Sequence, residues 1–139
     1  MKSRKMLFFT IFFCLISFAC AAQSSPSDVV KKFYKSYYDR NASAFSACIT
    51  PGDMAFITKT FGEEGLSLFL NMFMGAMSGM SQDDLSSFKN IRILSEEIDG
   101  DKATVRVAVN GASPLNLVKI QGAWKIDLGL SNISNLFQF

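Results

Sequence analysis

The spacing of apolar side chains predicts a helix directly after residue 25. Large apolar and aromatic residues recur there at intervals of four in two adjacent series: Val29, Phe33 and Tyr37, then Val30, Tyr34 and Tyr38. This spacing builds one broad apolar face and leaves the lysines between them on the other side. Ser25 is a suitable N-cap, with Pro26 at the first helical position and Asp28 in the first turn. The helix should therefore begin at Pro26 and end near residues 39 to 41.

Helical patterns continue through the middle of the chain. Asn41 can cap a short second helix over Ala42–Cys48, which a turn at residues 50 to 52 would stop. Residues 54 to 60 predict a further helical turn or two. From residue 63 to about residue 80 the chain is strongly apolar and rich in methionine, which predicts a helix buried on more than one side. We do not interpret this segment as a membrane span, because it is short and contains serine and asparagine.

After residue 87 the apolar period changes from about 3.6 to two, which is typical of strands. Four strands are predicted, over residues 90 to 98, 103 to 109, 115 to 120 and 124 to 128. The turns between them are at residues 99 to 101, 111 to 114 and 121 to 122. Connections this short cannot be parallel crossovers, so the sheet should be an antiparallel meander. Helices followed by strands predict an α+β domain with the helices packed on one face of the sheet.

The first 22 residues are typical of a secretory signal. Lys2, Arg4 and Lys5 precede an uncharged run of 14 residues, from 6 to 19, and small residues follow. A spanning helix needs about 20 apolar residues, which favours cleavage over an uncleaved anchor. We therefore divide the chain into a signal peptide (1–22), a tether (23–25), an α+β domain (26–129) and a C-terminal tail (130–139).

Two kinds of cleavage fit this boundary. Residues 17 to 20 resemble a bacterial lipobox, in which Cys20 becomes the lipid-modified first residue, although Ser17 replaces the usual leucine and Phe18 is bulky. Ordinary signal peptidase would also accept the small residues around Ala21 and Ala22. The lipoprotein interpretation is favoured, because cysteine is otherwise rare at such a boundary.

The remaining cysteines are consistent with this interpretation. Cys14 lies in the apolar run and leaves with the signal, so the mature chain keeps Cys48, with or without Cys20. If Cys20 carries acyl chains such as palmitate, Cys48 is a free thiol, and a Cys20–Cys48 disulfide is a third option. No CxxC partner exists, so Cys48 is interpreted as a small buried apolar residue.

Charge and composition exclude several classes of function. The chain has 14 Lys and Arg against 12 Asp and Glu, but removing the three signal bases leaves 14 − 3 = 11 against 12, a net charge of −1. A near-neutral domain of this kind is not expected to bind nucleic acid. The absence of histidine excludes histidine-dependent triads and histidine metal ligands. With so few soft ligands, no metal or other cofactor is expected.

Several motifs together resemble those of a known protein family. They are the lipobox-like signal, Ser25-Pro26 before Val29-Val30 and Phe33-Tyr34, Asp101-x-Ala103-x-Val105, and Leu117-Val118-Lys119-x-x-Gly122-x-Trp124-Lys125-Ile126-Asp127. Over roughly residues 25 to 129 the chain resembles small bacterial lipoproteins of unknown function with a nuclear transport factor 2-like (cystatin-like) domain. The resemblance implies a long N-terminal helix cupped by a curved antiparallel sheet. In relatives this cone encloses an apolar pocket or forms dimers across the sheet.

The sequence also suggests which residues would line a pocket or an interface. The candidates are Phe33, Tyr34, Tyr37, Met72, Met77 and Trp124. Because methionines adapt to irregular apolar surfaces, the Met-rich helix could line the mouth of the cone or a subunit contact, or belong to the core. Some enzymes of the broad fold pair an aspartate base with a tyrosine, and Asp127 with the tyrosines of the first helix invites that comparison. The tyrosines fit an apolar helix stripe better, and Asp127 falls on the polar side of its strand, so no catalytic residue is assigned.

The sequence thus predicts an exported, lipid-anchored envelope protein that acts as a binding module. The membrane would be reached through the anchor, with the domain facing the periplasm or the exterior, and a soluble secreted form is the alternative. The expected partners are a small apolar ligand, a protein or a second copy of the chain. An enzyme on the same fold and a purely structural homodimer are the competing functions.

Overall fold

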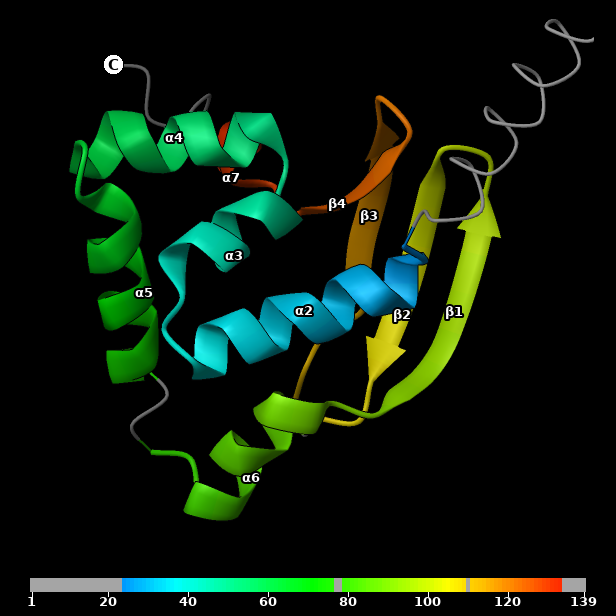
Figure 1. Cartoon of the computed structure of the whole chain (residues 1–139), viewed down its shortest axis with the longest axis horizontal. Helices are drawn as coiled ribbons and strands as arrows, with labels where there is room; N and C mark the ends of the chain where they lie inside the picture. The colour runs from blue at the N-terminus through cyan, green and yellow to red at the C-terminus, as the bar shows by residue number, and fades with distance from the viewer. Residues whose placement is uncertain (1–23, 77–78, 110, 134–139) are drawn as a thin grey trace, which may run out of the picture.

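The computed structural model describes residues 24–76, 79–109 and 111–133, and Figure 1 shows their arrangement. The helices before the sheet are α2 (Pro26–Tyr38), α3 (Ala42–Cys48), α4 (Pro51–Phe61), α5 (Gly65–Ala76), α6 (Gln82–Ser87) and the 3-10 turn η1 (Phe88–Asn90). The strands are β1 (Ile93–Asp99), β2 (Lys102–Val107), β3 (Leu115–Ile120) and β4 (Ala123–Asp127), and α7 (Leu130–Ile133) follows them. The predicted order of helices and then strands is confirmed.

The four strands form one sheet in the order β1-β2-β3-β4, with antiparallel neighbours throughout. Gly100 has a φ of 59°, and the β3–β4 turn places Gln121 and Gly122 at φ 50° and 79°. Two successive residues of positive φ produce the turn twist that suits a two-residue hairpin. A register shift between Ile93 and Ser95 interrupts the β1–β2 pairing, and β1 bends strongly in this region (Figure 1). The predicted α+β meander is confirmed, and the arrangement is consistent with a cone-like fold.

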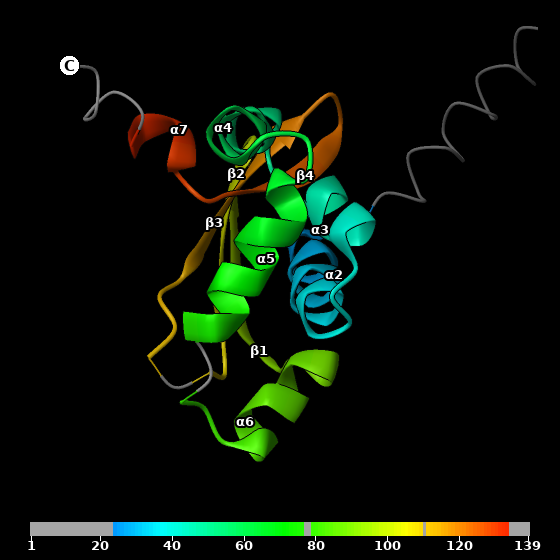
Figure 2. The ribbon, with the colours of Figure 1, turned by 90° about the vertical axis from the view of Figure 1, so that its left-hand side faces the viewer.

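Helix α2 lies across one face of this sheet, with α3 beside it (Figure 2). A capping box fixes its start: Asp28 N–H donates to Ser25 Oγ, and Ser25 N–H donates to the Asp28 carboxylate, both at 3.2 Å. The N–H and hydroxyl of Ser27 both donate to Glu96 Oε1 at 2.9 Å, which ties the helix start to β1. Local capping and one tie to the sheet thus orient the helix.

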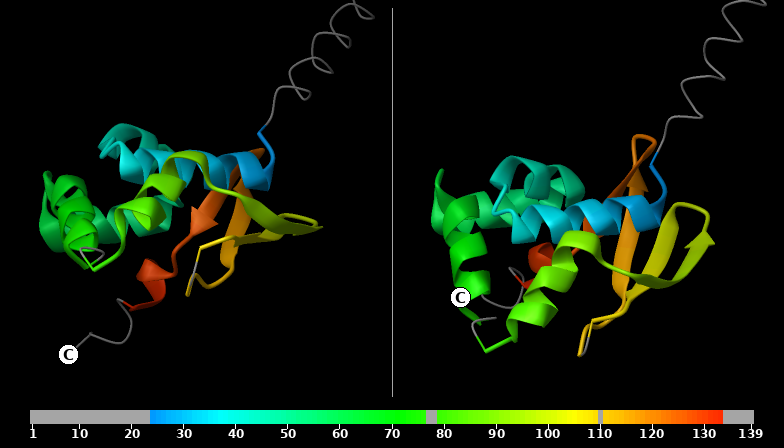
Figure 3. Two further views of the ribbon diagram at one scale, coloured as in Figure 1. Left: turned by 90° about the horizontal axis from the view of Figure 1, so that it is seen from below. Right: turned by 60° about the horizontal axis from the view of Figure 1, so that its bottom comes forward.

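The core lies between α2 and the inner face of the sheet. Its most completely buried side chains include Val30, Phe45, Ile57, Phe88, Val105, Leu117 and Ile126. They come from four helical or 3-10 segments and three strands that are far apart in the sequence, so the core joins both halves of the chain. The β1–β2 hairpin extends away from this core, on the side opposite α4 and α5 (Figure 3).

Two expectations for the helices are wrong. Residues 50 to 52 do not form a simple turn: Thr50 caps α4, whose 11 residues begin at Pro51. The Met-rich helix is not buried on more than one side, because Leu70 is 3% exposed while Leu68 and Met72 are 49% and 63% exposed. Helix α5 packs on α4 and α3, and these neighbours cover one side only.

The strand boundaries also differ from the prediction at their ends. Residue 90 closes η1 instead of opening a strand, and β2 ends at Val107. Strand β4 ends at Asp127, because the next backbone N–H, that of Leu128, donates to a side chain of α4 instead of a neighbouring strand. Among the described residues, no helix has both the length and the hydropathy that crossing a membrane requires.

Candidate functional site

An apolar cavity of about 320 Å³ lies where α2 and η1 meet the segment that joins β2 to β3. Aromatic side chains form one wall, and Val109 and residues 111 to 115 also line the cavity. The full lining described comprises Phe33, Tyr34, Tyr37, Met80, Phe88, Val109, Gly111, Ala112, Ser113, Pro114, Leu115 and Leu128. Cavities of about 300 to 1,000 Å³ with apolar and aromatic walls are typical of small-molecule sites. We call this space the apolar cavity.

The aromatic wall is held by ring contacts. Phe33 and Tyr34 meet edge to face with centroids 5.5 Å apart, and Tyr34 meets Phe88 in the same way at 5.1 Å. Tyr37 lies 5.9 Å from Phe88. Such contacts favour fixed ring orientations. The wall is therefore a preformed surface, because the helical period of α2 places Phe33, Tyr34 and Tyr37 on one face and two of these rings contact Phe88 of η1.

The two cavity tyrosines stay protonated at neutral pH. Burial raises the pKa of Tyr34 above its usual value of 10.0, and it raises the pKa of Tyr37 to about 12. A protonated phenol can donate a hydrogen bond but cannot act as a base. The chemistry that these side chains offer is apolar contact with a weakly polar rim.

A buried carboxylate holds one residue of the cavity lining, Leu128. Asp53 is 0% exposed, and its two oxygens accept from Leu128 N–H at 2.7 Å and from Leu130 N–H at 2.9 Å. The Thr50 hydroxyl also donates to it, at 2.9 Å, while Asp53 N–H donates to Thr50 Oγ1 at 3.2 Å. Asp53 thus completes the cap of α4 and holds Leu128 in the cavity wall.

Sequence reasoning missed Asp53. The signal was present, because Thr50-Pro51 followed by an acid three residues after the threonine is the start of a capped helix. The local pattern would have found the cap. It could not have found the bonds to Leu128 and Leu130, which lie more than seventy residues away in the chain.

A second cavity, of about 480 Å³, lies between α2, α3 and the β3–β4 hairpin. Its lining includes the three lysines Lys32, Lys35 and Lys125, together with Cys48 and Trp124. We call this space the lysine cavity. Lys119 Nζ lies 5.5 Å from the centroid of the Trp124 ring, a cation–π contact that helps to hold the indole in place.

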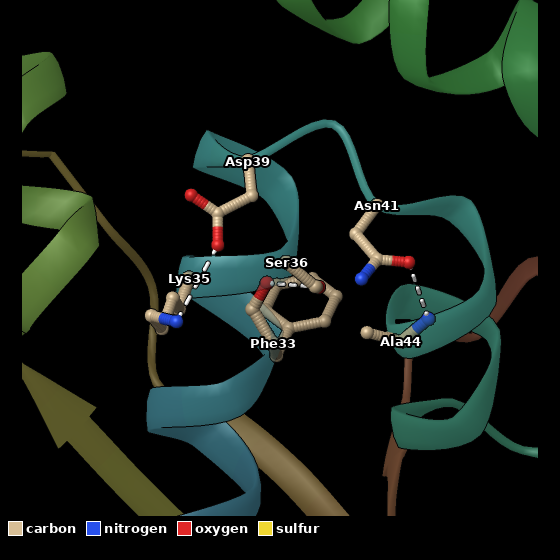
Figure 4. Close-up of polar contacts among 6 residues, drawn as sticks. All are labelled: Phe33, Lys35, Ser36, Asp39, Asn41 and Ala44. Atoms are coloured by element: carbon tan, nitrogen blue, oxygen red, sulfur yellow. Dashed lines mark hydrogen bonds and ion pairs between the residues drawn. The ribbon is translucent and has the colours of Figure 1, made fainter.

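Figure 4 shows the α2–α3 end of the lysine cavity. Lys35 Nζ lies 3.5 Å from the Asp39 carboxylate, an exposed ion pair one helical turn apart. The Ser36 hydroxyl donates to the Phe33 carbonyl at 2.7 Å, and the Asn41 side chain accepts from Ala44 N–H at 3.1 Å. The polar groups at this end are thus engaged with their own helices.

The structure separates the predicted site residues. Phe33, Tyr34 and Tyr37 share the apolar cavity, whereas Trp124 lines the lysine cavity. Met72 is exposed on α5 and lines neither of the two. Cys20 and Met77 lie outside the described residues.

The aspartate suggested for an enzyme is not brought to the tyrosines. Asp127 is exposed, its Oδ1 accepts from Gly129 N–H at 2.9 Å, and it lines neither cavity. Within the described ranges, no three acidic or cysteine side chains gather as metal ligands would. Cys48 is a buried thiol with no disulfide in the described part of the chain.

Comparisons with known proteins add one structural likeness. No family model matches the sequence, and no curated protein matches it. A crystal structure of a Campylobacter jejuni protein, provisionally described as an NTF2-like transpeptidase, is similar to this chain with 21% identity and a TM-score of 0.47. The match covers 76% of this chain and 99% of that one. The α+β assignment above rests on this chain's own strand order and helix packing.

Proposed function

We propose that the protein is an exported, lipid-anchored binding protein whose domain holds a small apolar molecule in the apolar cavity. This proposal rests on the aromatic wall of a cavity of about 320 Å³. The wall consists of Phe33, Tyr34, Tyr37 and Phe88. Burying apolar surface contributes about 25 cal/mol per Å², so an apolar ligand gains most from such a wall. The ligand class is a compact neutral molecule with a largely hydrocarbon or aromatic body.

Binding is favoured over catalysis by the chemistry of the lining. The described residues around the apolar cavity include no carboxylate, amine or thiol, and burial raises the pKa values of both tyrosines. General acid–base catalysis needs a group that exchanges a proton near the working pH. The lining supplies none, and Asp127 lies elsewhere.

The proposed anchor places the domain near a membrane. If Cys20 is acylated, the five residues from 21 to 25 span at most about 18 Å before α2 begins. More than one acyl chain would make the attachment stable without any apolar surface on the domain. The cavity would then be presented within a short distance of the bilayer, where apolar molecules concentrate.

The experiment measures binding of a neutral apolar dye, N-phenyl-1-naphthylamine, by fluorescence. We expect saturable binding that falls at least tenfold in Ala112→Phe and in Leu115→Trp, because both add bulk to the cavity lining. Ala108→Phe is the matched control, since Ala108 is exposed near the same strand end and lines neither cavity. Equal dye affinity in all four proteins would contradict the proposal. Native mass spectrometry of gently extracted protein would then report any bound ligand and the subunit number.

A further inference from the structure

The lysine cavity combines positive charge with an apolar surface. Among its described lining residues, three lysines face one acid, Asp39, although the chain beyond the signal is close to neutral. Asp39 is already paired with Lys35 at 3.5 Å. The positive charge that is not balanced within the cavity therefore belongs to Lys32 and Lys125, one on α2 and the other on β4.

These two lysines line the same cavity as Cys48. Burial raises the pKa of the Cys48 thiol, and the charges of Lys125 and Lys32 both act to lower it. Lys125 is also held beside this cysteine, because its ammonium group donates to the carbonyl of Ala47, the preceding residue. Two cations from different elements thus share the cavity lining with one cysteine.

Each of the two ammonium groups makes one hydrogen bond within the protein and has further N–H donors. Lys125 Nζ donates to the Ala47 carbonyl at 2.6 Å, and Lys32 Nζ donates to Ser24 Oγ at 3.4 Å. An ammonium group carries three N–H donors, so one bond each leaves further donors for a ligand. Hydrogen bonds from ammonium to an anionic oxygen are about twice as strong as neutral ones.

The lining also has an apolar part beside polar residues such as Ser36 and Asn41. Val29 from α2, Ala44 from α3 and Trp124 from β4 contribute hydrocarbon and indole surface to the same space. A volume of about 480 Å³ is much larger than an inorganic anion needs and falls within the range of organic ligands. The ligand that uses both parts of the lining has an anionic head and an apolar body.

We propose that the lysine cavity is a second binding site, which takes a monomeric anionic amphiphile with its head between Lys32 and Lys125 and its apolar body against Trp124. The site is separate from the apolar cavity, differs from it in ligand class, and does not depend on the proposed function. The head is an oxyanion such as a carboxylate or a phosphate ester. The amphiphile is bound as a free molecule and not as part of a bilayer.

Two residues of the chain report on this cavity directly. Trp124 is the only tryptophan of the sequence, and Cys48 becomes the only thiol in the Cys14→Ser/Cys20→Ser chain. The probe is octanoate below its critical micelle concentration. Octan-1-ol, which has the same chain length and no charge, is the control ligand. The protein is prepared without detergent. We expect octanoate to change Trp124 fluorescence saturably, to slow the labelling of Cys48, and to bind at least tenfold more tightly than octan-1-ol.

Charge and volume are varied separately. Lys32→Gln/Lys125→Gln should weaken octanoate binding at least tenfold, and Ala44→Leu should do so with both lysines intact. The control is Lys59→Gln/Lys89→Gln, which removes the same charge from exposed positions outside both cavities and should bind normally. Octanoate and octan-1-ol binding equally well, or the two lysine pairs giving equal affinities, would overturn the proposal. So would a fluorescence change without protection of Cys48.

A final arm distinguishes a free amphiphile from a membrane surface. The same proteins are mixed with phosphatidylglycerol vesicles and with phosphatidylcholine vesicles and then sedimented. The proposal expects octanoate binding to depend on Lys32 and Lys125 whether or not vesicles are bound. Lysine-dependent binding to anionic vesicles with no binding of octanoate would assign the lysines to a bilayer surface and overturn it.

Discussion

Replacing Asp53 with alanine tests how the two halves of the chain are joined. The carboxylate is fully buried in α4, and it accepts from the backbone N–H groups of Leu128 and Leu130 at 2.7 and 2.9 Å. Asp53→Ala removes both acceptors, while the donors stay in an interior that water does not readily reach. The α4 cap and the chain after β4 should therefore both weaken.

The magnitude follows from the bonds that are lost. A hydrogen bond to a charged group contributes about 1.5 to 3 kcal/mol, and a buried donor without an acceptor costs about 1 to 3 kcal/mol. Because these costs overlap, we expect Asp53→Ala to lower the free energy of unfolding by about 3 to 5 kcal/mol in total. That is a large share of the roughly 5 to 15 kcal/mol that stabilises a typical domain.

Asp28 provides the matched control. It occupies the same third position of a capped helix, and its N–H donates to the cap oxygen of Ser25 as Asp53 N–H donates to Thr50 Oγ1, but it is exposed. Asp28→Ala should therefore cost only about 1 kcal/mol, the usual contribution of a cap. Urea unfolding followed by circular dichroism measures both variants. Equal losses in the two would refute the reasoning, because the ties to Leu128 and Leu130 would then contribute nothing.

Asp53 also links stability to the apolar cavity. Leu128 lines that cavity and depends on Asp53 for its backbone bond. Asp53→Asn keeps one oxygen acceptor and should fall between wild type and Asp53→Ala in stability. At temperatures where both remain folded, the affinity for the neutral dye should follow the same order. Unchanged affinity in a folded Asp53→Ala protein would show that the wall does not need this tie.

Three further predictions follow from burial and from the predicted signal sequence. Met72→Lys should change the free energy of unfolding by less than about 0.5 kcal/mol, because Met72 is 63% exposed; Leu70→Lys, at a site 3% exposed, should prevent folding, as thermal melts can check. Burial raises the pKa of Tyr37 to about 12 from 10.0, so the unfolded chain loses this proton first and stability should fall as pH rises from 10 to 12. Tyr37→Phe should reduce that fall in melts recorded across the same range. Cys20→Ser should be recovered in the aqueous phase of a detergent partition and the parent in the detergent phase; if both are aqueous and the parent begins at residue 22 or 23, the anchor is excluded.

Local chemistry allowed much of the fold to be predicted from the sequence. Ser25 and Asn41 cap α2 and α3, whose bounds agree with the predicted helix starts and, for α3, with the predicted end. Gly100 and Gln121-Gly122 mark the tight hairpins that require an antiparallel meander. Caps and turns involve residues only a few positions apart, so a linear pattern can reveal them. Helix α4 was underestimated because Pro51-Gly52 also resembles a turn.

The sequence by itself determined the order of the elements, the antiparallel sheet and the aromatic stripe of α2. Only the tertiary structure decided which apolar residues stay exposed, as Met72 does, and that Trp124 and Tyr34 line different cavities. It also decided that Asp53 joins α4 to the chain after β4, and that Lys32 and Lys125 line one cavity with Cys48. These relations depend on which faces meet when segments distant in the chain pack against one another. A periodic pattern records that a face is apolar, whereas its partner is chosen by the packing of the whole domain.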